Sequence, residues 1–88
     1  MKQVLKYKLG IVGLQEIELP EGAQILSVQT QHESICLWAL VDQDKAKEMR
    51  RIILIGTGHY LPEGDHKFLG TVQELGGDLV WHLFERKK

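Results

Sequence analysis

The sequence predicts an all-β fold, a small antiparallel barrel or sandwich of about six or seven strands with at most one short helical turn. Nearly every apolar segment is short and rich in β-branched or aromatic residues. Several of these segments alternate apolar and polar residues, which is the period of a strand with one face in water. Turn-forming residues recur at intervals of about 8–12 residues, a spacing typical of small β domains.

The length of the chain sets its organisation. With 88 residues, 43% of them hydrophobic, and no repeat or linker, we expect a single β domain over residues 1–88. A domain of this size buries only about 60–65% of its unfolded surface. The core should therefore be thin, and a pocket should lie at an edge, a loop cluster or a subunit interface.

Alternation predicts the first two strands. In Leu5–Leu9 and Gln15–Leu19 apolar residues alternate with charged residues, so each strand should place one face on the core and one in water. The segment Pro20–Gly22 then provides a tight turn, because proline restricts φ and glycine accepts a positive φ.

Two further strands follow. Ile25–Gln31 separates an apolar face, on which Leu26 is expected, from a face of uncharged polar residues. A tight connection at His32–Glu33 leads into Ile35–Val41, which is apolar on both faces and should be a central strand. We expect Trp38 of that strand to be an anchor of the core.

The second half of the chain supplies the remaining elements. The polar stretch Asp42–Met49 is expected to be a hairpin loop or a single helical turn. A buried strand at Ile52–Ile55 follows it. Strands at Phe68–Leu75 and Leu79–Phe84 form a last pair, joined by a two-residue turn at Gly76–Gly77.

Charge and composition exclude several classes of protein. The chain carries 11 basic and 12 acidic residues for a net charge of -1, so we expect no binding to duplex nucleic acid. The single cysteine, Cys36, sits in an apolar run and should be a small core residue. No run approaches the roughly 18 apolar residues of a membrane span, and no signal-peptide pattern is present, so we expect a cytoplasmic protein without a membrane partner.

The candidate ligand-binding residues lie at or beside the predicted strand Ile52–Ile55. They are Arg50, Arg51, Gly56, Thr57, Gly58, His59 and Tyr60. Backbone amides around such glycines can converge on an anion, while the tyrosine, histidine and arginines can stack on or pair with a phosphorylated or planar ligand. The alternative is that the glycines only turn a corner and that the other residues contact a protein.

The basic residues at two places in the chain carry a conditional prediction. Arg50–Arg51 and the tail Arg86–Lys88 would form a positive patch if the fold brings them together. Otherwise they are the polar start of a strand and a solvated terminus.

Catalytic and metal-binding patterns are weak. Thr57 and His59 have the spacing at which a nucleophile and a base share one side of a strand, but nothing activates the threonine. His59, Asp65 and His66 lack a recognised metal-ligand spacing. We therefore expect a protein that is not an enzyme and has no metal site and no cofactor.

Several phrases of the sequence resemble those of a known family. They are Pro20–Ala23, Ile25–Gln29, Leu37–Asp42, Gly56–His59, Leu69–Gln73 and Val80–Glu85. With them the chain, from Tyr7 to Glu85, resembles a family of small uncharacterised proteins encoded by tailed bacteriophages and prophages.

The resemblance implies a context for function. Small accessory phage proteins bind and neutralise host factors, so the expectation is a phage-encoded binding protein that antagonises antiviral defence in the host cytoplasm. Sequestration of a small nucleotide immune signal by a homo-oligomer is the leading form of this hypothesis. The alternative is a protein–protein interaction module that inhibits a host protein or serves as a minor phage component.

Overall fold

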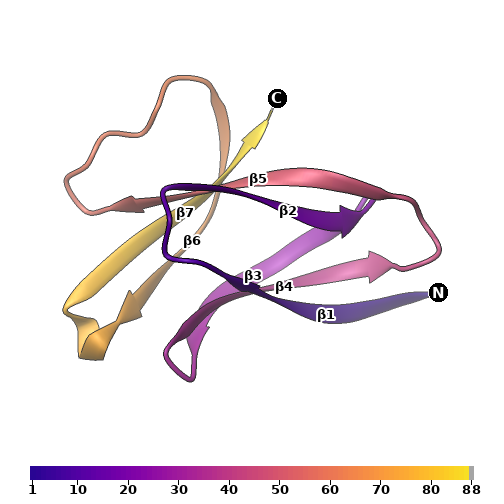
Figure 1. The fold of residues 1–88 in the computed structure, drawn as a ribbon, viewed down its shortest axis with the longest axis horizontal. Helices are drawn as coiled ribbons and strands as arrows, with labels where there is room; N and C mark the ends of the chain where they lie inside the picture. The colour runs from indigo at the N-terminus through magenta and orange to yellow at the C-terminus, as the bar shows by residue number, and fades with distance from the viewer. Residues whose placement is uncertain (88) are drawn as a thin grey trace.

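The computed structural model describes residues 1–87 and confirms the all-β prediction (Figure 1). The described residues form seven strands and one short 3-10 turn. The elements are β1 (Lys2–Leu9), β2 (Leu14–Pro20), β3 (Gln24–Gln31), β4 (Ser34–Asp42), β5 (Lys47–Gly56), β6 (Asp65–Glu74), η1 (Leu75–Gly77) and β7 (Leu79–Lys87).

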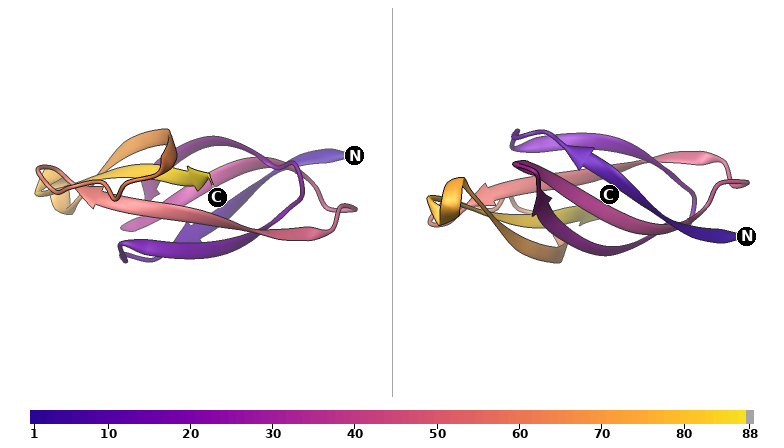
Figure 2. Two further views of the ribbon diagram at one scale, coloured as in Figure 1. Left: turned by 90° about the horizontal axis from the view of Figure 1, so that it is seen from above. Right: turned by 90° about the horizontal axis from the view of Figure 1, so that it is seen from below.

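The strands form two antiparallel sheets that pack as a sandwich. The three-stranded sheet has the order β1-β4-β3, and the four-stranded sheet has the order β2-β5-β7-β6. The chain therefore changes sheet between β1 and β2, between β2 and β3, and between β4 and β5. The molecule is flat, with extents of 39 × 31 × 16 Å, and the views from above and below show the twisted sheets overlying each other (Figure 2).

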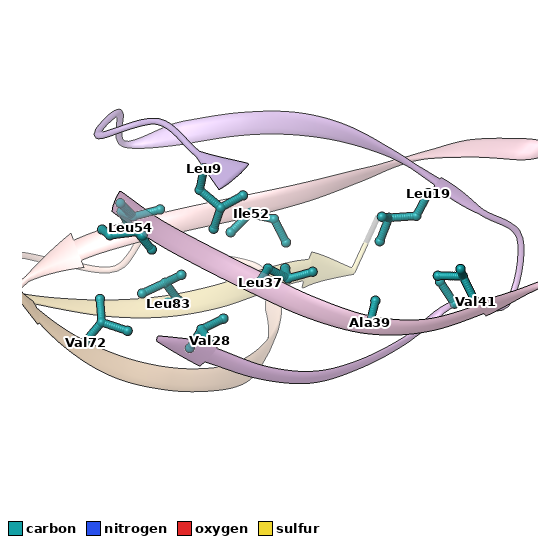
Figure 3. Close-up of a cluster of buried hydrophobic side chains, with 12 residues drawn as sticks. Leu9, Leu19, Val28, Leu37, Ala39, Val41, Ile52, Leu54, Val72 and Leu83 are labelled. Carbon is teal, nitrogen blue, oxygen red and sulfur yellow. The ribbon is translucent and has the colours of Figure 1, made fainter. Parts of the chain in front are cut away.

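The core lies between the two sheets (Figure 3). The alternation expected for Leu5–Leu9 and Gln15–Leu19 is present, because Leu9 and Leu19 are buried while the intervening charged residues are exposed. The central position predicted for Ile35–Val41 is confirmed by β4, which pairs with β1 and with β3. Burial of each Leu or Ile side chain contributes about 1.5–3 kcal/mol. The buried cluster contains Leu9, Leu19, Ala23, Val28, Ile35, Leu37, Ala39, Val41, Ile52, Leu54, Val72 and Leu83.

Edge strands β3 and β6 of the two sheets lie against each other and close one side of the sandwich. The Thr30 hydroxyl donates a hydrogen bond to the carbonyl oxygen of Gln73 at 2.6 Å. Gly70 sits at a shift in the β6–β7 register with a φ of 156°, and a Cβ on it would lie 2.6 Å from Cγ2 of Val28. Only glycine satisfies both the backbone conformation and the close approach of the strands.

The predicted tight turns occur as expected at two places. The amide of Ala23 donates to the carbonyl of Pro20 at 3.1 Å, and Gly22 between them has a φ of 77°. His32 and Glu33 have φ values of 49° and 66°, and both central residues of a type I′ hairpin need positive φ.

The orientation of two large side chains differs from the prediction. Leu26 is exposed, because the register between β3 and β4 shifts between Ile25 and Ser27 and leaves Leu26 as a bulge residue. Trp38 is partly exposed on the outer face of β4, while its neighbours Leu37 and Ala39 fill the core. A strand with apolar residues on both faces does not reveal which of them faces inward.

The connection from β4 to β5 contains no helical turn. The Asp42 carboxylate accepts a hydrogen bond from the amide of Asp44 at 3.0 Å, and the Asp42 carbonyl accepts one from the amide of Lys45 at 3.1 Å. Side-chain capping of this kind stabilises a turn. The following strand begins at Lys47, earlier than predicted, because β2 pairs with it along its polar first half.

The last hairpin is longer than a two-residue turn. β6 ends at Glu74, which pairs with Leu79, so four residues make the loop. Leu75, Gly76 and Gly77 have φ values of 51°, 66° and 100°. The two glycines adopt a positive φ readily and so fit this short 3-10 turn. Leu75 is the only one of the three residues with a side chain, and its positive φ is unfavourable.

Candidate functional site

The predicted site residues lie near the two ends of β5. Arg50 and Arg51 belong to its first half, whereas Gly56 is its last residue and begins the loop to β6 (Figure 1). Arg51 and Gly56 are five positions apart along the strand, which is about 16 Å. The structure therefore divides the predicted site residues into two separate groups.

Arg50 points between the sheets and forms an ion pair with Glu85 of β7. Its Nε donates to one carboxylate oxygen of Glu85, Nη2 donates to the other at 3.0 Å, and Nη1 donates to the carbonyl of Ala23 at 2.9 Å. The side chains of Arg50 and Glu85 are only 17% and 13% exposed. The hydrogen bond to Glu85 raises the pKa of Arg50, although burial acts in the opposite direction. These contacts make Arg50 a structural residue that ties β5 to β7 and to Ala23.

Arg51 points to the opposite, outer face of the four-stranded sheet. There Glu16, Arg51, Arg86 and His66 are successive register partners on β2, β5, β7 and β6. We call these four residues the charged row. Nε of Arg51 lies 3.3 Å from a carboxylate oxygen of Glu16, and the two side chains are 51% and 49% exposed. An exposed pair of this kind contributes only about 0–1 kcal/mol.

Two features of the charged row are unfavourable in the isolated chain. Arg51 and Arg86 are register partners across β5 and β7, and like charges opposite each other destabilise a sheet. Their side chains lean apart, Arg51 toward Glu16 and Arg86 toward Gly64. Nε of Arg86 and Nε2 of His66 are buried without a hydrogen-bond partner among residues 1–87. An anion beside the arginines would offset their repulsion.

A cleft of about 780 Å³ opens beside this row, and we call it the charged cleft. It forms where β7 stops pairing with β5 at Arg51 while β5 continues back to Lys47. Its lining contains five cationic side chains, three carboxylates and one methionine. These residues are Glu16, Glu48, Met49, Arg50, Arg51, Lys67, Glu85, Arg86 and Lys87.

The cations of the charged cleft outnumber their partners. Arg50 is paired with Glu85 and Arg51 with Glu16, whereas within residues 1–87 no carboxylate forms an ion pair with Lys67, Arg86 or Lys87. The third carboxylate of the lining, that of Glu48, accepts a hydrogen bond from the amide of Gly22 at 3.1 Å. The cleft is therefore suited to an anionic ligand.

A smaller pocket of about 290 Å³ lies at the other end of β5. Its lining is mostly apolar and contains Gly56, Thr57, His59, Asp78, Leu79, Val80 and Trp81. Gly58 and Tyr60 do not line it, and the Tyr60 side chain is almost entirely exposed. With one carboxylate and no basic side chain other than His59, this pocket is poorly suited to a phosphate.

The hydroxyl of Thr57 is bonded to His82, and His59 takes no part in that contact. Thr57 Oγ1 lies 2.8 Å from Nε2 of His82, and Thr71 Oγ1 lies 3.0 Å from Nδ1 of the same ring. The backbone amide of His59 donates to the carbonyl of Gly56 at 3.0 Å and closes the turn. His82 thus ties β6, β7 and the start of the loop together.

The sequence identified part of the charged cleft. The conditional patch of Arg50–Arg51 with the basic tail is present for Arg86 and Lys87, whereas Lys88 lies outside the described residues. No local sequence pattern marks Lys67 and Glu85 as residues of the cleft. Their place follows from the β6–β7 register, in which Lys67 is opposite Glu85, and no local pattern encodes that register.

The described part of the chain has neither a metal-binding cluster nor a membrane-spanning helix. Residues 1–87 contain no group of three or more His, Cys, Asp or Glu side chains arranged to hold a metal ion. Among the same residues there is no helix that is long and apolar enough to cross a membrane.

Comparison with known proteins gives one family. Residues 1–88 match a family described as "Domain of unknown function (DUF7352)". No curated protein and no solved structure matches the chain.

Proposed function

The chain belongs to this DUF7352 family, and we propose that it is a binding protein that holds a small phosphorylated ligand in the charged cleft. The ligand is held stoichiometrically and is not converted. The observation that carries the proposal is the cleft of about 780 Å³ in which Lys67, Arg86 and Lys87 have no carboxylate partner among residues 1–87.

The chemistry of the lining favours phosphate over other anions. A guanidinium group presents a planar fork of donors that matches two phosphate oxygens, and lysine adds a mobile point charge. Exposed Met49 offers an adaptable apolar surface for the rest of the ligand. The volume lies within the range of about 300–1,000 Å³ that is usual for small-molecule sites.

The context of the proposal comes from the resemblance to small phage proteins. A protein that sequesters a host nucleotide immune signal needs affinity and no catalytic group. In this proposal the cationic side chains of the charged cleft supply the affinity. The proposed role is therefore antagonism of antiviral defence by sequestration.

A thermal-shift screen tests the proposal. Cyclic dinucleotides and ADP-ribose derivatives are added at millimolar concentration, and bound ligand is analysed after heat denaturation. At a ligand concentration of 100 times Kd, mass action adds about 2.7 kcal/mol of stability. For a domain of this size the Tm should then rise by about 10 °C or more, and the recovered ligand should be intact.

A pair of matched double variants locates the site. Lys67→Gln with Arg86→Gln removes two charges from the cleft, and Lys2→Gln with Lys8→Gln removes two exposed charges from β1, outside the cleft lining. Only the first pair should abolish the thermal shift, and added KCl should weaken it in the wild type. If no phosphorylated compound shifts the Tm, or if the cleft variant binds like the control, the proposed function is wrong.

A further inference from the structure

The outer face of the four-stranded sheet has an apolar row directly beside the charged row. Leu14, Ile53, Phe84 and Phe68 are successive register partners across all four strands. Leu14 and Phe68 are 55% and 56% exposed at the two edges, and Ile53 is buried between them. The Phe68 and Phe84 rings meet edge to face with centroids 5.3 Å apart. We call these four residues the apolar row.

The outer face of the other sheet is built differently. Along β1, exposed Val4 lies between Lys2 and Lys6, and Lys6 donates from Nζ to Oε1 of Gln31 on β3 at 2.7 Å. This bond spans β4, where the register places Cys36 between the partners of Lys6 and Gln31. A polar contact thus crosses that face, on which Val4 and Trp38 are also exposed in part.

The apolar and charged rows together are complementary to a second copy of themselves. A two-fold axis that lies between two such faces and parallel to the strands places β2 of one copy over β6 of the other, and β5 over β7. Leu14 then faces Phe68 of the second copy, and Ile53 faces Phe84. In the neighbouring row Glu16 faces His66, so the acidic edge of one copy meets the basic edge of the other.

The same axis brings the arginines of the two copies together. Arg51 of one copy faces Arg86 of the other, so the register places two arginines from each copy in the interface. Packed sheets are about 10 Å apart, a distance that arginine side chains from both sides can span. Four like charges in this arrangement repel unless an anion lies between them.

The area of the face also predicts that the two copies associate weakly without a ligand. Four strands about 4.8 Å apart and about seven residues long offer roughly 400–450 Å² of flat sheet per copy. A stable interface usually buries about 800 Å² per partner. The two copies should therefore associate weakly until a ligand adds its own contacts.

We propose that two copies of this chain pair through the apolar row and that a phosphorylated ligand bound by the facing arginines closes the dimer. Ligand binding and dimerisation then strengthen each other, as linkage requires. The inference rests on the proposed function for its ligand class. The apolar row itself is independent of it.

Sedimentation with an inorganic pyrophosphate probe tests the inference. The dissociation constant of the dimer is measured with the probe and in KCl of the same ionic strength, and the probe should lower it by at least about tenfold. Phe68→Asp should leave a folded monomer under both conditions. Leu14→Asp provides a second variant on the opposite edge. Val4→Asp is the matched control, because Val4 is 52% exposed on the other sheet, and it should dimerise like the wild type.

The outcomes separate the two proposals. A wild type that stays monomeric with the probe, or a dimer that Phe68→Asp and Leu14→Asp leave intact, overturns the interface. A dimer that the probe does not strengthen overturns the coupling. The proposed function stands in each case if a phosphorylated compound still shifts the Tm and Lys67→Gln with Arg86→Gln removes that shift.

Discussion

The two faces of the four-stranded sheet use neighbouring arginines in different ways. Arg50 points inward, where Glu85 and the Ala23 carbonyl occupy its donors in a largely buried site. Arg51 points outward, half exposed, with a single contact of 3.3 Å to Glu16. Strand alternation thus assigns one arginine to the fold and leaves the next one available to a ligand.

The two arginines differ in the environment of the charge that is left unpaired when either of them is removed. Removal of one member of the inward-facing pair leaves the other charge unpaired in a poorly hydrated site, which lowers the stability of the fold. Loss of an outward partner leaves a charge that water solvates at once. Stability measurements should therefore respond most to substitution of Arg50, and binding measurements to substitution of Arg51.

Arg50→Ala is expected to have the largest effect on stability. It leaves the Glu85 carboxylate largely buried and unpaired, so the free energy of unfolding should fall by about 3 kcal/mol in urea denaturation. Arg50→Ala combined with Glu85→Ala should cost less than the sum of the two single substitutions. A loss below about 1 kcal/mol for Arg50→Ala would contradict a structural role.

The Arg50 contribution should not vary with pH in the ordinary range. The folded-state pKa of Arg50 is raised above its usual value, so the added stability is complete at lower pH and is lost only as the pH rises through that raised pKa. The stability difference between the wild type and Arg50→Ala/Glu85→Ala, which lacks both ionisable groups of the pair, should still be present at alkaline pH. Its disappearance at alkaline pH, still below the usual arginine pKa, would refute this assignment.

Gly70→Ala should have the next largest effect. The new methyl group would meet Val28 at the β3–β6 contact and would also sit at a positive φ, so we expect a loss of about 2–3 kcal/mol. Gly58→Ala is the matched control, since Gly58 has a φ of 89° and nothing within 4 Å of the added carbon. Equal losses for the two glycines would show that the close approach is unimportant.

Thr71→Val should have an intermediate effect on the outer face. It removes the hydroxyl 3.0 Å from Nδ1 of His82 at an exposed site, so the loss should be about 1 kcal/mol. The nitrogen chemical shifts of the His82 ring should change at the same time. Unchanged shifts would mean that the contact with Thr71 does not determine the tautomer of the His82 ring.

Arg51→Ala should have the smallest effect on stability and a clear effect on binding. Loss of its exposed contact with Glu16 should change the free energy of unfolding by no more than about 0.5 kcal/mol. Affinity for a phosphorylated ligand should fall about tenfold or more, because a charge-assisted hydrogen bond is lost. The reverse pattern would place Arg51 with Arg50 among the structural residues.

The sequence predicted best what depends on local pattern. Alternation assigned the faces of β1 and β2, and glycine and proline identified the turn at Pro20–Gly22. It failed where pairing between distant segments decides the outcome. The bulge at Leu26 depends on β4, and the outward side of Trp38 depends on which face of β4 meets the other sheet.

The candidate site shows the same limit. Basic residues at Arg50–Arg51 and in the tail were recognisable, but their meeting depended on the β5–β7 register. The ion pair of Arg50 with Glu85 joins residues 35 positions apart, and no local sequence pattern predicts it. The glycine loop after Gly56 was conspicuous in the sequence, yet the structure places it at the opposite end of β5 from the arginines of the charged cleft.

The placement of β1 and β2 in different sheets has a consequence for how the protein unfolds. Each is an edge strand of its own sheet, and only Gly10–Gly13 connects them. Detachment of these two connected strands would remove an edge from both sheets at once, so neither sheet can open alone without straining the other. We expect a single cooperative transition in which hydrogen-exchange protection is lost from both sheets together.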